Sequence, residues 1–590
     1  MSWSVSCVVF IGMKLAPTEL FKVLSDVKPL SKSASVHRFF LCISLLVLFA
    51  STGLHAQWST DPSNNLIVGY GLLPEMCSDS TGGAYVTYEV SSTYPRHIAL
   101  RRLNRYGYQP WNTSIAIEGV KPESRYASLA SDGQSGALIA FLDREWNQNP
   151  TDPRYNDRLR VQRVDSAGNM LWGTVGVRVS IGEHTQSADD YPAIVPDGSG
   201  GCVVLWIDTL SMITVQRLDG TGNRMWTDSG IVIEQRQTSV KQLVQDGSGG
   251  YILYIGSGRF HRLNSDGNRL WGPNGVTVDS WGVPKIVSDF RGGVILAGMN
   301  LISYNNGDPL WAAKCQHLDS TGTMTWGSSG LVLGDSLQNT VLSAPAIIAK
   351  ARRSGVSVFE WYRRVGASGL GTFTQIMRPD GSPILPSNGI AVSTVSAGLQ
   401  VGGQWLIVGI NDRAIHIWTD NRTPPGIYAQ VIDSLGQRLW SQNDVAVCLQ
   451  SLGGLHVITD GNGGFILAGY REFDFSVRVQ QVSKNGNLGE VITSVLAGNP
   501  LGTSGFELLQ NYPNPFNGFT TIQYTLGHAS NVAIEVYDIL GQFVQTLTKE
   551  YQLAGVHQAR FDAMNLATGV YTVAVRTPSQ TQFKKMVYLK

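Results

Sequence analysis

The chain has 590 residues, which is enough for two to four domains, and its formal net charge at pH 7 is +1. This balance excludes the large basic excess expected of a protein that binds nucleic acid or an anionic membrane through charge. Only 15% of the residues are charged, whereas there are 65 glycines, 15 tryptophans and 21 tyrosines. Such a composition favours short strands joined by tight turns.

The first 56 residues have the order of a secretory signal peptide. Basic residues precede the apolar run from Phe39 to Ala50, and small residues follow it up to Ala56. The run is shorter than the ~20 residues that a membrane-spanning helix needs. We therefore expect a signal peptide with an over-long basic region at residues 1–56, and no transmembrane helix in the mature chain. An uncleaved anchor is the alternative.

Four cysteines remain after removal of this segment. They are separated by more than 100 residues and form no CxxC pair, so no zinc or redox motif is present. Export permits disulfides, but the four cysteines occupy different places in the repeat described next. We expect buried free thiols at Cys77, Cys202, Cys315 and Cys448.

Two short motifs alternate between about residue 66 and residue 496. The first motif is an aspartate followed by glycines and an apolar strand. Clear copies begin at Asp79, Asp132, Asp197, Asp246, Asp289 and Asp460, and degenerate copies end at Gly355 and Gly403. In each copy the aspartate can accept hydrogen bonds from nearby backbone N–H groups, and the glycines allow a sharp turn.

The second motif is Asp or Asn, a glycine three residues later, and a tryptophan four residues further on. Copies begin at Asn104, Asp165, Asp219, Asn264, Asp319 and Asp433, and weaker copies centre on Gly381 and Gly486. The mean period is about 54 residues. A glycine followed by alternating apolar residues comes four positions after the tryptophan, as at Gly176 and Gly230.

Each unit is predicted to hold four short strands. These are the segment after the glycine pair, the segment before the second motif, the tryptophan segment, and the glycine-apolar segment. A unit of this size cannot bury both faces alone, so neighbouring units must stack. We predict an all-β chain in which residues 57–497 form a β-propeller with eight blades, or with seven if a degenerate copy is not a full blade. An open β-solenoid fits the long period less well.

The repeat resembles the propeller repeats of secreted bacterial proteins that contain aspartate and tryptophan. Its spacing differs from the sialidase Asp-box, in which Asp precedes Gly by two residues and Trp follows by three. It differs from quinoprotein propellers in its shorter Asp-to-Gly offset. Both likenesses imply a propeller fold, and neither transfers catalytic residues to this chain.

Residues 506–590, after a linker at 498–505, are predicted to form a small Ig-like β-sandwich. The segment contains NYPNPFN from Asn511, YDILG from Tyr537, LATGVY from Leu566 and the ending KKMVYLK from Lys584. In this order the motifs closely resemble the C-terminal sorting domain of the type IX secretion system. The resemblance implies passage through the periplasm of a Gram-negative bacterium, recognition by the outer-membrane translocon, and release or attachment at the cell surface. An Ig-like spacer is the alternative.

The last strand of this domain is the expected sorting signal. It would offer an edge for recognition by strand addition. The residues assigned to the signal are Lys584, Lys585, Met586, Val587, Leu589 and Lys590.

No catalytic constellation emerges from the sequence. The HExxH, GxSxG and phosphate-loop motifs are absent, so we expect no cofactor. Asp197 and Asp460 stand in glycine-rich loops that could suit calcium, but calcium loops need more carboxylates, and turn formation is the favoured interpretation.

A candidate binding face is predicted where charged residues follow the strand after each glycine pair. Structural ion pairs between blades are the alternative and favoured role. Trp146, Trp281 and Trp418 are further candidates, as surfaces for stacking on sugars. The charged candidates are Asp143, Arg144, Asp208, Asp420, Arg422, Arg471 and Glu472.

Three functions remain open from the sequence. The first is an exported monomeric propeller that binds a ligand, a glycan or a protein without catalysis. The second is a secreted glycoside hydrolase or sialidase-like enzyme, which would need a carboxylate pair, with or without an arginine cluster, at the central channel. The third is a passive structural component of the surface.

Overall fold

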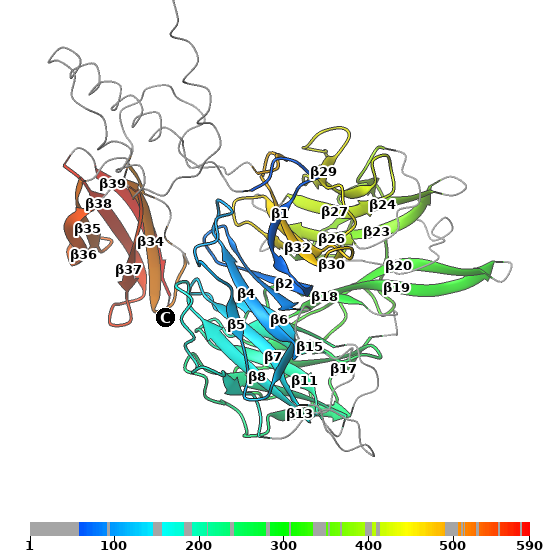
Figure 1. Ribbon diagram of the computed structural model, residues 1–590, viewed down its shortest axis with the longest axis horizontal. Coiled ribbons are helices and arrows are strands. Elements are labelled where there is room, and N and C mark those ends of the chain that lie inside the picture. Colours follow the sequence, from blue (N-terminus) through cyan, green and yellow to red (C-terminus); the bar gives the residue numbers. More distant parts are fainter. Residues whose placement is uncertain are drawn as a thin grey trace, which may run out of the picture. The chain divides into compact units, whose positions relative to one another are not determined.

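In the part of the chain that the computed structural model describes, all regular elements are β-strands (Figure 1). The chain divides into two units, Met1–Val491 and Ile492–Lys590, each of which is described by itself. The described residues are 58–90, 95–145, 156–181, 191–208, 211–235, 241–278, 284–305, 308–333, 350–351, 355–365, 369–395, 404–408, 413–489, 506–508, 511, 514–526, 530–552, 555–578 and 581–589. The predicted signal peptide and linker lie outside them.

Eight four-stranded antiparallel sheets follow one another in the first unit. Blades 1 and 2 are β2(Leu72–Ser78), β3(Ala84–Val90), β4(His97–Leu103), β5(Ile115–Ile117), and β6(Glu123–Ser131), β7(Ala137–Glu145), β8(Asn156–Val164), β9(Val177–Arg178). Blades 3 and 4 are β10(Ala193–Pro196), β11(Cys202–Ile207), β12(Met212–Leu218), β13(Ile231–Gln235), and β14(Gln242–Gln245), β15(Tyr251–Tyr254), β16(Arg259–Leu263), β17(Val276–Thr277).

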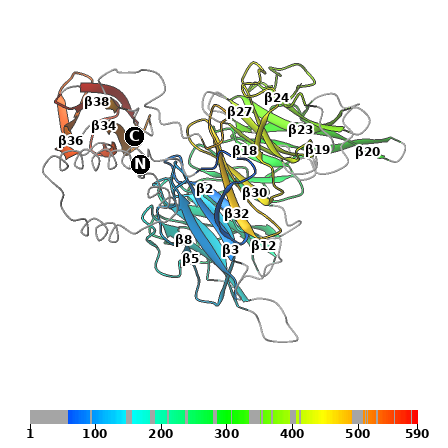
Figure 2. The same cartoon turned by 45° about the horizontal axis from the view of Figure 1, so that its top comes forward.

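The second half of the ring continues the pattern. Blades 5 and 6 are β18(Lys285–Ser288), β19(Val294–Asn305), β20(Asp308–Leu318), β21(Leu331–Val332), and β22(Lys350–Ala351), β23(Ser357–Val365), β24(Gly369–Met377), β25(Ile390–Ala391). Blade 7 is β26(Gln404–Val408), β27(Ala414–Asp420), β28(Gly426–Ile432), β29(Val445–Cys448). Blade 8 combines β30(Gly453–Thr459), β31(Phe465–Tyr470) and β32(Ser476–Val482) with β1(Leu66–Tyr70). The long hairpin β19–β20 projects from blade 5 (Figure 2).

The eight sheets form a closed ring. The first strand of each blade is its inner strand, and every inner strand contacts the inner strands of both neighbouring blades, including β30 with β2. Strand β1, from the start of the described chain, pairs with β32 and becomes the outer strand of blade 8 (Figure 1). The propeller therefore has eight blades, and its two ends are joined by backbone hydrogen bonds within one sheet.

The strand directions define two ends of the ring. Within each blade the turns after the first and third strands lie at one end, which we call the turn face. The loops after the second strand and the connections to the next blade lie at the other end, which we call the loop face. Both sequence motifs map to the turn face.

The aspartate of the first motif caps its own turn. In blade 4, Asp246 is fully buried and accepts hydrogen bonds from the backbone N–H groups of Ser248 and Gly250, both at 2.7 Å. Its other oxygen accepts a hydrogen bond from Arg262 Nη2 at 2.8 Å. The carboxylate therefore satisfies the turn and neutralises a partly buried guanidinium group.

The tryptophan of the second motif fastens most blades to the next. Trp271 Nε1 of blade 4 donates to the carbonyl of Ser320 in blade 5 at 3.0 Å, and Arg262 Nη1 donates to the same carbonyl at 2.8 Å. Gly322 in that turn has φ +85, and a Cβ there would lie 3.1 Å from Trp271. Glycine is thus required both for the backbone conformation and for the approach of the indole ring.

Trp58 makes the equivalent joint where the ring closes. Its Nε1 donates to the carbonyl of Arg105 in blade 1 at 2.9 Å. Gln480 of blade 8 donates to the carbonyl of Ser59 at 2.8 Å, as Gln162 of blade 2 does to that of Gly173 at 2.6 Å. Since the outer strand of blade 8 comes from the start of the ring, its joint tryptophan comes from there too.

Two details of the predicted blade were wrong. The tryptophan segment is not a strand: after an isolated bridge such as Val164↔Met170 the chain leaves the sheet and turns before the outer strand. The fourth strand is instead the inner one, which precedes the first motif. The degenerate copy at Gly403 was also misplaced, because the next strand, Gln404–Val408, is the inner strand of blade 7 and not its second strand.

The four predicted free cysteines are confirmed. Each is buried and unpaired in the propeller. Burial raises the pKa of Cys448 to about 11 and raises the pKa of the other three as well. They behave as small apolar residues of the blade cores.

The second unit is a β-sandwich. One sheet has the order β33(Phe506–Leu508), β34(Phe519–Leu526), β37(Gly555–Asp562), and the other has the order β36(Phe543–Gln552), β35(Ser530–Tyr537), β38(Gly569–Arg576), β39(Thr581–Tyr588). The residues between the sheets are apolar and include Ile534, Phe561 and Met586. Alternating inward and outward side chains along these strands produce the Ig-like fold that the sequence predicts.

Candidate functional site

The predicted charged face lies on the loop face of the propeller. Asp143, Asp208, Asp420 and Arg471 each lie at or just after the end of the second strand of a blade. The topology therefore brings the four positions to one end of the ring. Their contacts, however, are mostly local.

Asp143 is a structural group. It is fully buried and lies 2.6 Å from Arg160 Nε on the adjacent strand. It also accepts the backbone N–H of Lys121 at 2.6 Å, which fixes the connection between blades 1 and 2. Asp208 closes its own hairpin by accepting the N–H of Met212 at 2.9 Å.

Asp420 and Arg422 also form a structural network. Arg422 pairs with Asp420 and lies 3.0 Å from Asp444. Trp418, a predicted sugar platform, is fully buried and donates to Asp420 at 3.1 Å, so that role is wrong for Trp418. Trp146 and Trp281 lie outside the described residues.

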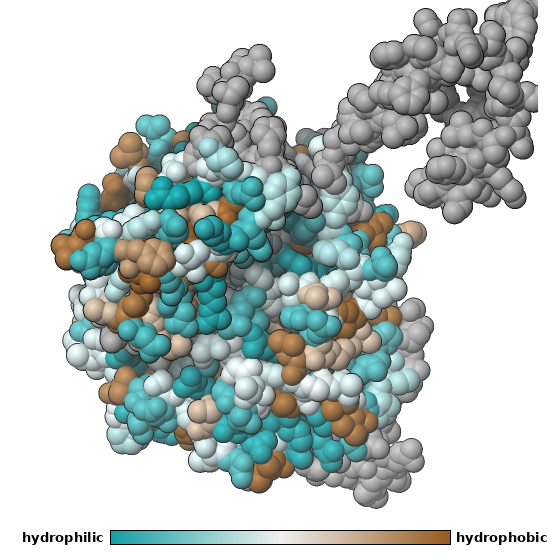
Figure 3. All heavy atoms as spheres, turned by 90° about the vertical axis from the view of Figure 1, so that its left-hand side faces the viewer, coloured by the Kyte–Doolittle hydropathy of each residue, from teal (hydrophilic) through white to brown (hydrophobic). Residues whose placement is uncertain are grey.

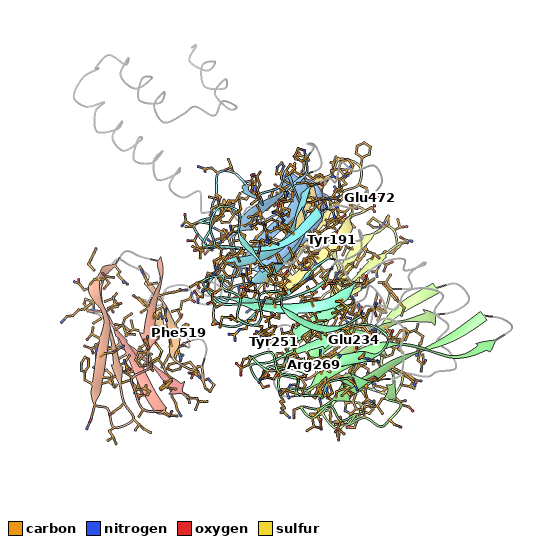
Figure 4. All side chains as sticks on the ribbon, turned by 90° about the horizontal axis from the view of Figure 1, so that it is seen from below. Tyr191, Glu234, Tyr251, Arg269, Glu472 and Phe519 are labelled. Atoms are coloured by element: carbon orange, nitrogen blue, oxygen red, sulfur yellow. The ribbon has the colours of Figure 1, made fainter. Side chains whose placement is uncertain are left out.

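The last predicted pair lies on blade 8. Arg471 is 3.5 Å from Asp474 and stands over the ring of Phe473. Glu472 is exposed and is labelled in Figure 4. Of the seven predicted residues, only Glu472 is both exposed and outside the local networks described above.

A different set of residues is singled out by backbone geometry. The inner strands of blades 8, 1 and 2 each contain a register shift beside their second strand, and each has one residue with positive φ six positions before the turn aspartate. Those residues are Gly454, Leu73 and Tyr126. The inner strands of the other five blades pair without a shift. Bulges that hold a non-glycine residue in this conformation often occur beside functional sites.

Polar residues gather around these bulges and form what we call the inner-strand cluster. They come from blades 8, 1 and 2 and from the connection into blade 3. The cluster consists of Glu75, Glu89, Arg96, Glu123, Arg125, Tyr126, Arg144, Tyr191 and His456.

Glu75 and His456 face each other across the boundary of blades 8 and 1. The carboxylate oxygen lies 3.2 Å from His456 Nε2, and each side chain is about one-third exposed. Burial raises the pKa of Glu75 to about 7 and lowers the pKa of His456 to about 4. At mildly acidic pH the pair therefore holds one proton between the two groups and carries no net charge.

Glu89 anchors the bulge of blade 2. It accepts the backbone N–H of Tyr126 at 2.8 Å and lies 3.1 Å from Arg125 Nε. Arg96 approaches the same carboxylate at 3.8 Å and is 37% exposed. Glu123 lies 3.9 Å from Arg125 Nε, and burial raises its pKa. Two carboxylates thus meet at one guanidinium group.

Two tyrosines complete the cluster. The ring of Tyr126 lies between Arg125 and Arg144, at 4.6 and 5.1 Å from the guanidinium carbons. Tyr191 meets Tyr126 edge to face at 5.0 Å. Burial raises the pKa of Tyr191, and the nearby charge of Glu89 adds to the shift. In Figure 4, Tyr191 lies between the blue and cyan strands of the first blades and the yellow strands of blade 8.

The cluster can bind charge and transfer protons. With Glu75 protonated, its three guanidinium groups face two carboxylates, so an anionic group is attracted. Of the cluster residues, only Arg144 was predicted from the sequence. The only signal was the presence of glutamate and histidine four residues before the turn aspartates Asp79 and Asp460, where blades 2 and 3 have Ser128 and Ala193.

The loops considered for calcium are turns in the structure. Asp197 accepts the N–H groups of Ser199 and Gly201 at 2.8 Å and pairs with Arg217 at 3.1 Å. In the part of the chain that the structure describes, no group of three or more His, Cys, Asp or Glu residues is arranged to hold a metal ion. No helix among the described residues has the length and apolar character needed to cross a membrane.

The predicted sorting signal lies on β39, an edge strand of the sandwich. Met586 is buried in the core, Lys585 and Leu589 are exposed, and Lys590 lies outside the described residues. The end of this strand is partly covered by the NYPNPFN segment. Phe516 exchanges backbone hydrogen bonds with Val587 and Leu589, both at 2.9 Å.

The edge of β39 is also held by a side chain of that segment. Asn514 accepts the N–H of Val587 at 2.8 Å and donates to the carbonyl of Lys585 at 3.0 Å. Strand addition along this part of the edge would have to displace Asn514 and Phe516.

The fold defines a protein with an eight-bladed propeller and a C-terminal β-sandwich. Residues 510–589 match the family described as the secretion system C-terminal sorting domain. The chain therefore carries a type IX sorting domain, and the type IX secretion system delivers the protein to the cell surface or the extracellular space. A search of curated proteins found no relative.

Among solved structures the chain is similar to an ulvan lyase described as a new polysaccharide lyase family, at 10% identity and a TM-score of 0.39, over 73% of this chain and 97% of that one. It is similar to PorZ, a surface component of the type IX secretion system of Porphyromonas gingivalis, at 10% identity and a TM-score of 0.19. The match covers 90% of this chain and 100% of PorZ. A quinoprotein alcohol dehydrogenase-like protein from Bacteroides thetaiotaomicron matches at 11% identity and a TM-score of 0.33, over 60% and 81%. These TM-scores are too low to support any inference about ligand or activity.

Proposed function

We propose that this protein is an exported propeller that binds an acidic glycan at the inner-strand cluster. The observation that carries the proposal is the set of matching bulges in blades 8, 1 and 2, which present the cluster at one place on the ring. Arginine groups bind carboxylate and sulfate through paired hydrogen bonds, and tyrosine rings offer a surface to sugar rings.

The domain order of the chain agrees with export of a binding protein. We propose that residues 1–56 direct the chain across the inner membrane and are removed, that residues 57–497 form the binding unit, and that residues 506–590 are read by the translocon after the linker at 498–505. Deletion of residues 506–590 should leave the propeller inside the cell. Normal appearance of the truncated protein in the medium would contradict this assignment.

Binding is best tested with trigalacturonate and with a glycan array that includes neutral and acidic chains. We expect saturable binding of trigalacturonate, weakened about tenfold by Arg96→Ala, because Arg96 is the most exposed arginine of the cluster. The matched control is Arg224→Ala, which removes a partly exposed arginine from the turn face. If no glycan on the array bound, the third function, a passive component of the surface, would be favoured.

Catalysis is the second candidate, because Glu75 combines a pKa of about 7 with contact to His456. A carboxylic acid that stays protonated near neutral pH can act as a general acid in glycoside cleavage, with Glu89 or Glu123 as the second carboxylate. Release of new reducing ends from acidic polysaccharides, abolished in Glu75→Gln, would establish an enzyme. Binding without cleavage would leave the protein as a binder.

A further inference from the structure

A pocket separate from the inner-strand cluster lies on the loop face between blades 7 and 8. Its volume is about 460 Å³, which falls within the range of small-molecule sites. It lies on the blade 7 side of β30, where Leu455 packs, whereas His456 contacts Glu75 of blade 1. The pocket and the inner-strand cluster therefore occupy opposite faces of one inner strand.

The lining of the pocket suits an uncharged ligand. Asp420 is the only charged residue among the lining residues, and its carboxylate is already paired with Arg422 and accepts a hydrogen bond from Trp418. Arg422 is itself shared with Asp444. An ionic ligand would find no unpaired charge here, and its desolvation would not be compensated.

The same lining suits a ring that carries hydroxyl groups. Trp405 and Leu452 supply an apolar wall, and Asn421 and Ser451 stand exposed at the rim. The amide nitrogen of Gln450 donates to the carbonyl of Ser63 at 2.6 Å, which fixes the orientation of the amide. Gln450 therefore lines the pocket with its side chain already fixed in place.

We propose that this pocket binds a neutral sugar ring of an extracellular saccharide. An indole face packs against the C–H face of a sugar, while amide and hydroxyl groups at the rim bond to its hydroxyls. The inference stands on residues outside the inner-strand cluster and does not depend on the function proposed for that cluster.

The test uses the full-length protein with maltotriose, cellotriose and xylotriose as neutral probes and trigalacturonate as the acidic probe. We expect at least one neutral trisaccharide to bind saturably, measured by calorimetry and by tryptophan fluorescence. Ser451→Trp should abolish this binding by filling the pocket, since Ser451 is exposed and its replacement leaves the blade core untouched. Trp405→Ala should weaken it about tenfold.

The controls separate this pocket from the cluster. Arg96→Ala should leave neutral binding unchanged, and Ser451→Trp should leave trigalacturonate binding unchanged. Failure of all three neutral probes at millimolar concentration overturns the proposal. Neutral binding that survives Ser451→Trp also overturns it, because the sugar would then lie elsewhere.

Discussion

The two ends of the propeller are built from the same strands and differ in how their polar groups are used. On the turn face, the first-motif aspartates accept hydrogen bonds from two backbone N–H groups of their own turns, as Asp79, Asp132 and Asp246 do. Most of them also face an arginine or histidine of the third strand. On the loop face, the inner-strand cluster occurs once, in blades that share a bulge.

The difference between the two faces indicates that the turn face stabilises the ring and that the loop face holds the candidate site. A hydrogen-bonding arrangement that recurs in most blades serves what those blades share, namely their turns and the joints between neighbours. In Figure 3, polar and apolar side chains are interspersed over the viewed surface, and no apolar patch dominates it. The loop face is distinguished by the polar residues of the inner-strand cluster and by the positive φ of Leu73 and Tyr126.

The largest effect is expected from breaking a turn-face clamp. Asp246→Ala should lower the free energy of unfolding by about 3–4 kcal/mol, because the buried N–H of Gly250, the partly buried N–H of Ser248 and the partly buried Arg262 lose their acceptor. Urea unfolding followed by tryptophan fluorescence measures the loss. All tryptophans except Trp3 lie between Trp58 and Trp440, so the signal reports on the propeller.

The matched control is Asp266→Ala, which removes an exposed carboxylate from the next turn of the same blade. We expect this variant to unfold within about 0.5 kcal/mol of the parent protein. Equal effects of the two substitutions would mean that the clamp contributes nothing to stability.

A somewhat smaller effect is expected at the point of ring closure. Trp58→Ala should cost about 3 kcal/mol, since it removes a buried ring and the hydrogen bond to Arg105. Trp58→Phe should cost about 1 kcal/mol, because most of the packing remains. If Trp58→Ala were as stable as the parent protein in the same assay, the ring would not depend on this joint.

The sequence predicted the turn face well, because its motifs place Asp, Gly and Trp at fixed spacings that the turns require. It also predicted the sandwich and its sorting motifs. It did not identify Trp58 as the eighth joint residue, because that residue precedes the first copy of the motif by about 50 positions. The copy of the motif at Gly486 has Glu490 in the tryptophan position, and nothing in the pattern indicates that Trp58 takes the place of the missing tryptophan.

The candidate site was poorly predicted for a physical reason. Charged residues at strand ends, such as Asp143 and Arg422, satisfy nearby backbone and ionic partners, which a sequence pattern does not reveal. The bulges at Leu73 and Tyr126 carry no glycine, so nothing in the sequence marks their positive φ. The cluster depends on contacts between residues more than 300 positions apart, as between Glu75 and His456.

The loop face should respond to pH through Glu75. Its folded pKa of about 7 lies above the ordinary value of 4.5. The contribution of protonated Glu75 to the stability of the folded protein is therefore complete below pH 4.5 and is lost as pH rises through about 7. Glu75→Gln cannot ionise, so near pH 8 it should be about 1–2 kcal/mol more stable than the parent protein, a value reduced for the partial exposure of the side chain.

Urea unfolding at acidic and at alkaline pH measures this difference. Near pH 4 the two proteins should have similar stability, because Glu75 is then protonated in both the folded and the unfolded states. The exposed Glu118→Gln serves as the control and should show no such change with pH. A stability difference that is the same at both pH values would contradict the assignment of the shifted pKa to Glu75.

The smallest effect on stability is expected from a substitution that restores the turn-face pattern in a blade where one hydrogen-bonding residue differs. At the third strand of blade 5, Gln316 accepts the N–H of Trp326 at 3.1 Å and donates to the carbonyl of Gly327 at 2.6 Å. Blade 4 has His261 at this position, and both of its ring nitrogens are buried without a hydrogen-bond partner. His261→Gln should therefore raise the free energy of unfolding by about 1 kcal/mol at neutral pH.

The gain from His261→Gln should grow in acid. Burial, with the charges of Arg269 and Arg259 nearby, lowers the pKa of His261 to about 4. Glu234, labelled with Arg269 in Figure 4, is 3.8 Å from the ring, too far for a hydrogen bond. The stability contributed by the neutral ring is complete above pH 6.5 and is lost as pH falls toward 4, whereas glutamine does not titrate. Urea unfolding above pH 6.5 and near pH 4 tests the gain, with His97→Gln as the control. If His261→Gln were less stable than the parent protein, the shape of the His261 ring would matter more than its unpaired nitrogens.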